Sequence, residues 1–282
     1  MVGDFGGWKL WWLGISVVGN DLVESPRFGY LVEIPELGNF GGWVFAGFGG
    51  FHATLVYPVA DARFGWSAHD RISNYIHNTP VLTCENIDEE TKSSIFFKCD
   101  NFQKTGSFKI RGATNKILQL SKEQLDNSVI TTSSGNHGAA VSSTASKLGT
   151  SVKVIMPNNT PKVKVDNVKR YGGEIIFCEP NIKSRESTLN KMVNETGATI
   201  VHPYNDEKII AGQGTAAKEL LEYIPDLDVI IAPVSGGGLL AGTLLAAKNI
   251  NPKIEVYGAE PKNADDAYQS LKQNKIIPNK ST

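Results

Sequence analysis

Apolar residues follow two different spacings along the chain from about residue 70 onward. Short runs rich in β-branched and aromatic residues alternate with longer stretches in which apolar residues recur every three or four positions. The first spacing is typical of buried strands and the second of helices that pack on a sheet. The predicted strands are 94–99, 129–132, 152–156, 174–178, 199–202, 229–234 and 254–259, and the predicted helices are 70–77, 107–120, 136–148, one starting at 160–161, 184–196, 214–223 and 239–248.

The alternation of strands and helices predicts an α/β fold. The connections between predicted elements are short, and such connections place parallel strands side by side with helices on the faces of the sheet. A length of 282 residues suggests about two domains.

Residues 1–69 depart from this pattern. Residues 1–70 contain all five Trp and 13 of the 28 Gly, with three Lys or Arg against seven Asp or Glu. Neither strand nor helix spacing persists between the glycines. Residues 10–18 could pass as the apolar part of a signal peptide, but no Ala-x-Ala-like cleavage site follows. We therefore expect residues 1–69 to be a disordered or foreign extension that contributes nothing to the fold.

Composition excludes several classes of function. The chain has 28 Lys and Arg against 29 Asp and Glu, which argues against a general nucleic-acid or anionic-membrane binder. It has no run of 18 apolar residues, so no membrane-spanning helix is predicted. Three cysteines, at spacings that fit neither a zinc site nor a disulfide framework, predict reduced thiols in an intracellular, cytoplasmic protein.

A glycine run lies between the predicted strand 229–234 and the helix that follows it. The run Ser235-Gly236-Gly237-Gly238 lets the backbone approach a ligand closely, and N–H groups at a helix start favour an anion. It has neither the Gly-Lys-Ser/Thr ending of a Walker loop nor the glycine spacing of a dinucleotide-binding fold. The run predicts a phosphate-binding loop, and the alternative is a flexible helix start without a ligand.

A second polar segment, Ser133-Ser134-Gly135-Asn136-His137-Gly138, lies at another predicted strand-to-helix turn. Its hydroxyl, amide and imidazole groups, together with the backbone donors of the helix start, suit a small carboxylate or an amino-acid substrate. An ordinary helix cap is an equally good reading of these residue types.

Lys109 lies between Phe108 and Ile110 at the start of a predicted helix. Apolar neighbours exclude water from an amine, which lowers its pKa and makes it a better nucleophile. A surface Lys at a helix start is the alternative, and this segment alone favours that alternative.

An acidic run, Glu260-Pro261-Lys262-Asn263-Ala264-Asp265-Asp266, follows the last predicted strand. Carboxylates six residues apart, with a backbone carbonyl, suit a hard cation such as Mg²⁺ or Ca²⁺. The alternative is an acidic turn with a helix cap.

Taken together, these segments resemble those of a known enzyme family. The runs FQKTGSFKIRG, SSGNHG, HP followed by AGQGT, and PVSGGGLLAG occur in one order. From about residue 70 to 282 the chain is similar to the fold-type II pyridoxal-phosphate enzymes of the serine/threonine dehydratase family, and most similar to their serine racemase branch. This resemblance implies a tryptophan synthase β-like fold. Its large cofactor domain is formed by 70–127 and 205–282, and its small domain by 128–204.

The resemblance also implies a role for each motif residue. Lys109 is then the Schiff-base lysine, and Lys109 and Ser134 are the catalytic pair on opposite faces of the substrate. The residues that hold pyridoxal phosphate are then Phe108, Lys109, Asn136, Ser235, Gly236, Gly237, Gly238 and Leu239. Ser133, Ser134, Asn136 and His137 hold the substrate carboxylate, and Glu260, the carbonyl of Ala264 and Asp266 bind Mg²⁺ or Ca²⁺.

The resemblance implies racemisation of serine and β-elimination of L-serine to pyruvate and ammonia. It also implies two partners, a small amino-acid substrate and a second copy of the chain in a homodimer. Tyr204 stands where the racemases often have Asn, which leaves open a serine/threonine ammonia-lyase. In the family, the chain continues beyond the position that matches residue 282, and that part supplies a Ser or Cys that contacts the pyridine nitrogen. Two further interpretations therefore stay open: the large domain is incomplete, or the chain is an inactive relative. Lys104 and Thr105 match a nucleotide site, but Ala139 replaces its Gln, so we do not expect activation by ATP.

Overall fold

The computed structural model describes residues 15–18, 31–33, 43–45, 56–58, 64–273 and 275–277. The strands are β1 (Ile15–Val18), β2 (Leu31–Glu33), β3 (Trp43–Phe45), β4 (Val56–Pro58), β5 (Val81–Leu82), β6 (Ser94–Lys98), β7 (Val129–Thr132), β8 (Val152–Pro157), β9 (Glu174–Cys178), β10 (Thr199–Ile200), β11 (Val229–Pro233) and β12 (Glu255–Ala259). The helices are α1 (Phe64–Ile72), α2 (Glu85–Thr91), the 3₁₀ helix η1 (Asp100–Phe102), α3 (Lys109–Ile117), α4 (Lys122–Asp126), α5 (Asn136–Lys147), α6 (Lys162–Arg170), α7 (Ile182–Thr196), α8 (Glu207–Tyr223), α9 (Gly238–Ile250) and α10 (Asp266–Gln273).

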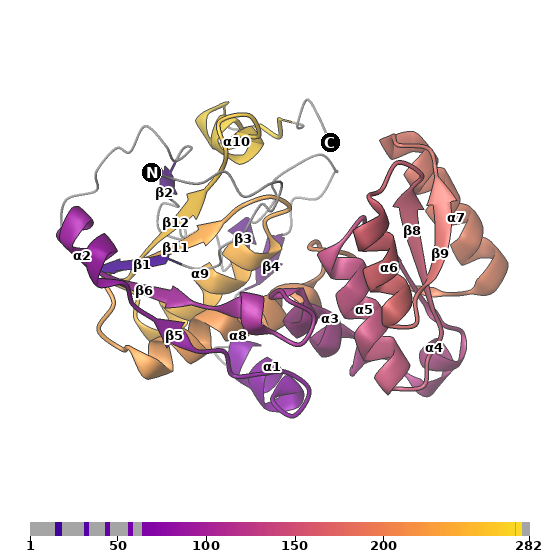
Figure 1. The fold of residues 1–282 in the computed structure, drawn as a ribbon, viewed down its shortest axis with the longest axis horizontal. Helices are drawn as coiled ribbons and strands as arrows, with labels where there is room; N and C mark the ends of the chain where they lie inside the picture. The colour runs from indigo at the N-terminus through magenta and orange to yellow at the C-terminus, as the bar shows by residue number, and fades with distance from the viewer. Residues whose placement is uncertain are drawn as a thin grey trace.

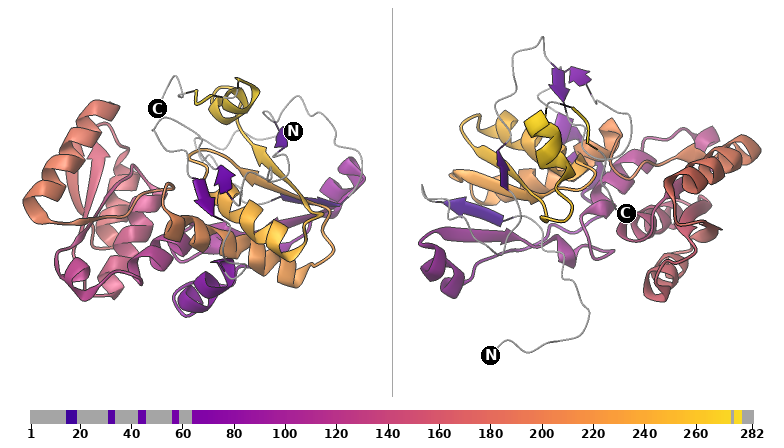
Figure 2. Two further views of the ribbon diagram at one scale, coloured as in Figure 1. Left: turned by 180° about the vertical axis from the view of Figure 1, so that it is seen from behind. Right: turned by 90° about the horizontal axis from the view of Figure 1, so that it is seen from above.

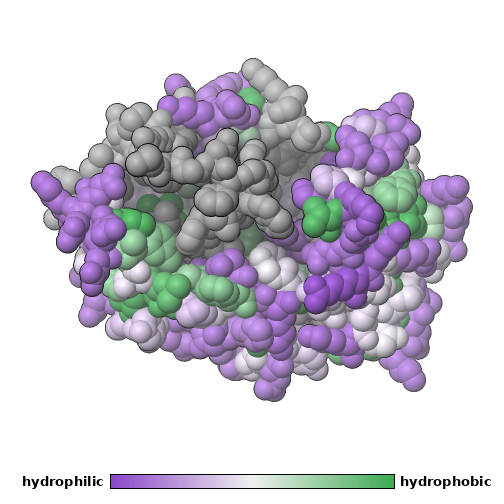
Figure 3. Space-filling view, in the orientation of Figure 1, coloured by the Kyte–Doolittle hydropathy of each residue, from purple (hydrophilic) through white to green (hydrophobic). Residues whose placement is uncertain are grey.

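A four-stranded parallel sheet forms the centre of one lobe, with the order β10-β7-β8-β9 (Figure 1). Successive side chains of a strand point to opposite faces, and the packing follows this alternation. Val152 and Val154 of β8 pack in the same cluster as Ala139 of α5, whereas Ile155 packs in a cluster with Leu189 of α7. Helices α5 and α7 therefore cover opposite faces. On the side shown in Figure 3, hydrophilic residues cover much of this lobe.

A six-stranded mixed sheet forms the centre of the other lobe, with the order β2-β12-β11-β1-β6-β5. Strands β11 and β12 are parallel, while β1 runs antiparallel to both β11 and β6. Helix α9 packs on β11 and β12, and α8 packs along α9. Figures 1 and 2 show the two sheets in separate lobes, with α3 beside the region where the lobes meet. The α/β class is confirmed, with the difference that the larger sheet also contains antiparallel pairs.

The start of the folded region differs from the sequence expectation. Helix α1 begins at Phe64 rather than near residue 70 and ends at Ile72 rather than near residue 77. Ala68, which precedes the predicted start, is 1% exposed and packs inside. The Lys218 amine lies 4.5 Å from the centre of the Trp66 ring. Two short strands of residues 1–63, β1 and β2, pair in the larger sheet, which the sequence did not predict. An unpaired strand presents a row of N–H and C=O groups with which another extended segment can pair. The expectation for the rest of 1–63 falls outside the described residues.

Helix α8 also begins earlier than its sequence pattern predicts. Both Gly212 and Gly214 lie inside it, and Asp206 caps it by accepting hydrogen bonds from the N–H groups of Lys208 and Ile209 at 2.9 and 3.2 Å. Glycine normally weakens a helix interior, but here it allows close helix packing. A Cβ at Gly214 would lie 2.6 Å from the carbonyl oxygen of Gly242 in α9.

In the described part of the chain, the helices are too short or too polar to cross a membrane.

We expect Gly214→Ala to destabilise the protein, because the added methyl group would force α8 and α9 apart. Overpacking of this kind costs about 1–3 kcal/mol. Lys183→Ala, at an exposed position of α7, is the control and should change the free energy of unfolding by less than about 0.5 kcal/mol. Urea unfolding of both variants is the measurement, and equal midpoints would show that the helices can separate without cost.

Candidate active site

Lys109 is the first residue of α3, and its amine contacts the segment between β10 and α8. Its Nζ donates a hydrogen bond of 2.7 Å to the carbonyl oxygen of Pro203, and it lies 5.2 Å from the centre of the Phe108 ring. Burial of the amine lowers the pKa of Lys109 to about 8. The predicted direction of the pKa shift is therefore confirmed, and its cause is loss of water around the charged form.

Two neutral histidines lie near this amine. Burial, with the positive charge of Lys109, lowers the pKa of His137 to about 3, and burial also lowers the pKa of His202 to about 4. The Nδ1 atom of His202 accepts from the N–H of Asn205 at 2.7 Å, and Nε2 of His137 lies 3.0 Å from the carbonyl oxygen of Val201. A carbonyl oxygen can only accept, so Nε2 of His137 is the protonated nitrogen. Both imidazoles are therefore uncharged at neutral pH.

The glycine run joins β11 to α9 in a tight turn. Gly237 is the N-cap residue of α9 and has a φ of 82°, a left-handed conformation that favours glycine. No side chain of the described residues caps this helix, so the N–H groups of its first turn lack side-chain partners. The predicted position at a strand-to-helix turn is confirmed, and the uncapped helix start is suited to an anion.

Tyr204 connects the lysine to the glycine run. A Cβ at Gly236 would overlap its ring, and a Cβ at Gly238 would lie 2.9 Å from its carbonyl oxygen. Pro203, the acceptor for the Lys109 amine, precedes Tyr204 directly. The amine and the uncapped start of α9 thus contact the same two-residue segment, although they come from positions more than 100 residues apart in the sequence.

The polar segment 133–138 forms the turn between β7 and α5. Ser133 Oγ accepts from the N–H of Gly135 at 3.2 Å, but no side chain in the described part of the chain caps α5. The ordinary helix cap, one of the two readings of this segment, is therefore absent. Ser134 and Asn136 are exposed, whereas His137 is buried. Gly138 allows α5 to approach β8, since its Cβ would lie 2.9 Å from Cγ1 of Val154.

The acidic run lies apart from these residues, at the end of β12 and the start of α10. Both carboxylate oxygens of Glu260 accept backbone N–H groups there, Ala267 at 3.1 Å and Tyr268 at 2.8 Å. Burial raises the pKa values of Glu260 and Asp266. Among the described residues, no cluster of three or more His, Cys, Asp and Glu could hold a metal ion. The geometry includes the helix cap that the sequence offered as the alternative to a metal site.

Some residues of the site carried no sequence signal. The carbonyl of Pro203 is invisible in a sequence, because any residue provides one. Lys164 of α6 lies beside the turn between β7 and α5, since a Cβ at Gly135 would lie 3.7 Å from Cδ of Lys164. Arg111, two residues after the lysine, is completely buried, and a buried Arg cannot be distinguished from a surface one by residue type alone. Ala139 is also completely buried, so its side chain offers nothing to a nucleotide.

The chain matches a family model described as pyridoxal-phosphate dependent enzyme over residues 72–282. The serine racemase of Arabidopsis thaliana is 53% identical over 210 residues, which cover 74% of this chain and 63% of that protein. The β-hydroxyaspartate dehydratase of Paracoccus denitrificans is 48% identical over 211 residues, covering 75% of this chain and 67% of that protein.

The fold is also similar to solved structures. Maize serine racemase superposes with a TM-score of 0.77 at 49% sequence identity, covering 79% of this chain and 68% of that one. The chain thus spans about two thirds of the length of these relatives. Because the family model matches well over half of the chain and the fold agrees, the chain belongs to the fold-type II pyridoxal-phosphate dependent enzymes.

Proposed function

We propose that this chain binds pyridoxal phosphate between Lys109 and the start of α9, and that it racemises serine and eliminates water from L-serine to give pyruvate and ammonia. One observation carries the proposal. The Lys109 amine is held at Pro203, and the glycine run packs against Tyr204, the next residue. An amine that can form a covalent bond to an aldehyde and a site for a phosphate therefore lie at the two sides of one short segment.

The residues present fit the cofactor. The uncapped N–H groups around Ser235, Gly236, Gly237, Gly238 and Leu239 would hold a phosphate through the dipole and orphan donors of α9. Phe108, which lies beside the lysine, would pack against the pyridine ring of the cofactor. Asn136, which is exposed at the start of α5, would contact the hydroxyl group of that pyridine ring. When bound, the cofactor supplies an electron sink for the electrons left on a substrate carbon that loses a proton.

Lys109 is the proposed general base. Because burial lowers its pKa to about 8, a useful fraction of the amine is neutral near physiological pH and can accept a proton from the substrate Cα. The neighbouring imidazoles of His137 and His202 are neutral, so neither adds a positive charge that would compete with protonation of the amine.

The α5 turn is the proposed carboxylate site. Ser133, Ser134, Asn136 and His137 come together at a helix start without a cap, and such a start favours a carboxylate through its orphan N–H groups. Ser134 is the proposed acid on the face opposite Lys109. Its hydroxyl would return a proton to Cα in racemisation, whereas loss of the β-hydroxyl would lead to elimination.

A serine/threonine ammonia-lyase is the second candidate. Tyr204 packs on the glycine run, and by the resemblance it stands where the racemases often have Asn. The relative named β-hydroxyaspartate dehydratase, at 48% identity, agrees with a framework that accepts elimination.

We also propose that Glu260, the carbonyl of Ala264 and Asp266 bind Mg²⁺ or Ca²⁺. Each carboxylate oxygen of Glu260 accepts one N–H group and keeps a further lone pair for a cation. Burial raises the pKa of Glu260, and the negative charge of Asp266 raises it further. A divalent cation would remove this repulsion between the two carboxylates.

Borohydride reduction of the chain with pyridoxal phosphate should place a stable label on Lys109. The yield should rise steeply between about pH 7 and about pH 9, because only the neutral amine reacts and its pKa is about 8. Peptide mapping by mass spectrometry is the measurement, with the exposed Lys191 as the internal comparison. A label found mainly on another lysine, with Lys109 unmodified, would refute this assignment.

Ser134→Ala should reduce formation of D-serine from L-serine by about 100-fold or more, which is the usual range for a lost acid. Pyruvate formation should fall by less than about tenfold, because elimination needs the proton abstracted at Lys109 but none returned to Cα. Chiral chromatography and a pyruvate assay measure the two products. Equal losses of both products in the variant would show that Ser134 only binds substrate. If the unaltered chain forms pyruvate but no D-serine, the ammonia-lyase is favoured. If it forms neither product, the chain is an inactive relative.

Mg²⁺ should stabilise the folded chain by about 2.7 kcal/mol at a free concentration about 100 times its Kd, because it binds only the folded state. Asp266→Asn removes one negative charge and should remove most of this gain. Gln269→Ala, on the same helix, is the control. Thermal unfolding with Mg²⁺ and with chelator is the measurement, and a metal-independent midpoint would leave Glu260 as a helix cap alone.

A further inference from the structure

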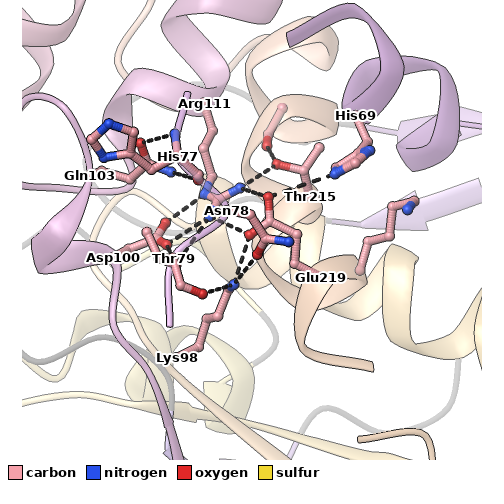
Figure 4. A network of polar contacts seen from close by, with 12 residues as sticks. His69, His77, Asn78, Thr79, Lys98, Asp100, Gln103, Arg111, Thr215 and Glu219 are labelled. Carbon is pink, nitrogen blue, oxygen red and sulfur yellow. Dashed lines mark hydrogen bonds and ion pairs between the residues drawn. The ribbon is translucent and has the colours of Figure 1, made fainter. Parts of the chain in front are cut away.

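A cluster of buried charges surrounds Arg111, which lies two residues after Lys109 in the first turn of α3. We call it the Arg111 cluster, and it contains Thr79, Lys98, Asp100, Arg111, Thr215 and Glu219 (Figure 4). Arg111 and Asp100 are 0% exposed, and the side chain of Glu219 is 1% exposed. Two cations and two carboxylates balance one another in this cluster. None of the proposed catalytic steps uses these charges, so they call for another explanation.

The guanidinium of Arg111 uses all five of its N–H donors. It binds Asp100 in a bidentate manner, from Nε to Oδ2 at 2.6 Å and from Nη2 to Oδ1 at 2.8 Å. It binds Glu219 in the same manner, from Nη1 to Oε1 at 2.7 Å and from Nη2 to Oε2 at 2.8 Å. The fifth donor reaches Oγ1 of Thr215 at 3.2 Å. Two bidentate pairs fix both the position and the plane of a guanidinium.

The partners of Arg111 are themselves fixed. Lys98, at the end of β6, donates to Oε2 of Glu219 and to the carbonyl oxygen of Thr79, both at 2.7 Å. Burial raises the pKa of both carboxyl groups, but the Arg111 guanidinium outweighs burial and holds the pKa values of Asp100 and Glu219 below their ordinary values. The two carboxylates therefore stay ionised at neutral pH, and the cluster ties α3 to η1, β6 and α8.

The first turn of α3 has no local capping signal. Phe108 is its N-cap residue and provides no side-chain cap, and its first turn has no acidic residue. The N–H of Gly112 finds its acceptor in α8, at Oε1 of Gln213, 3.2 Å away. The start of this helix is thus set by contacts with other elements rather than by a local capping signal.

Arg111 and Lys109 leave this turn in opposite directions. Residues two apart on a helix are rotated by about 200° around its axis, so the arginine faces the cluster while the lysine faces Pro203. We propose that Arg111 is a positioning residue: its two bidentate ion pairs fix the rotation of the first turn of α3 and thereby hold the Lys109 amine at the carbonyl of Pro203. The catalytic importance of this position rests on the function proposed above, but the geometry can be tested without it.

The chemical reactivity of Lys109 reports its position. Acetic anhydride acylates only neutral amines, so the pH dependence of labelling gives the titration midpoint of each lysine. The full chain, with no cofactor added, is labelled from about pH 6 to about pH 11, the range in which lysines titrate, and Lys109 is followed by mass spectrometry. His137 of α5 and His202, before α8, face this amine, and both are already neutral over this range.

We expect a midpoint near 8 in the unaltered chain. In Arg111→Lys, which keeps the charge but loses the fork, the midpoint should rise by roughly one pH unit or more toward 10.5 as the amine gains access to water. Thr215→Val removes one acceptor and should give a smaller rise. Leu221→Ala, a cavity variant in α8, should lower the unfolding temperature and leave the midpoint of Lys109 unchanged.

Each outcome decides the proposal. If Arg111→Lys is unfolded by circular dichroism, Thr215→Val carries the test. An unchanged midpoint of Lys109 in folded variants of the cluster would overturn the proposal. An equal rise of this midpoint in Leu221→Ala would also overturn it, because any destabilisation would then free the amine. A borohydride label on a different lysine would refute the proposed cofactor site and leave this result intact, so the two failures are distinguishable.

Discussion

The buried ion pairs of Arg111 are the interaction on which the arrangement of the site depends. Removing several charges from water is costly, and ion pairs in a protein interior offset that cost only when every donor and acceptor is satisfied. All five donors of Arg111 are satisfied, and each carboxylate oxygen of Asp100 and Glu219 has a partner. Such a cluster tolerates little displacement, because a shift of one element leaves a charge without a partner. Rigid placement of the α3 start follows from this constraint.

Two helices, α5 and α9, begin without side-chain caps at glycine positions. Helices α5 and α9 each follow a parallel strand, and in each the cap position is a glycine, Gly135 and Gly237. In most helices a Ser, Thr, Asp or Asn satisfies the first N–H groups, as Asp206 does for α8 and Asn181 for α7. Helices α2, α3 and α6 also lack a side-chain cap, but their cap positions are Cys84, Phe108 and Pro161. A glycine at the cap position after a parallel strand is what α5 and α9 share.

The close packing of glycines gives these helix starts their setting. Gly212 lets the backbone of α8 approach that of α3 at Arg111, and Gly214 lets α8 approach α9. Helices that meet through backbone atoms cannot slide past one another without steric overlap, so the lysine of α3 and the glycine run before α9 keep one relative position. The neutral state of His137 and His202 follows from the same dense packing, because burial disfavours a charged imidazole.

The sequence by itself determined the α/β class, strands such as Val129–Thr132 and Glu174–Cys178, and the position of the glycine run between a strand and a helix. These features depend on local residue order, which hydrophobic spacing and motif positions record directly. The tertiary structure alone decided where α1 begins, which carbonyl holds the lysine amine, and why Arg111 is buried. An acceptor that is a backbone carbonyl and an ion pair between residues 108 positions apart leave no periodic signal, because they arise only when distant segments pack together.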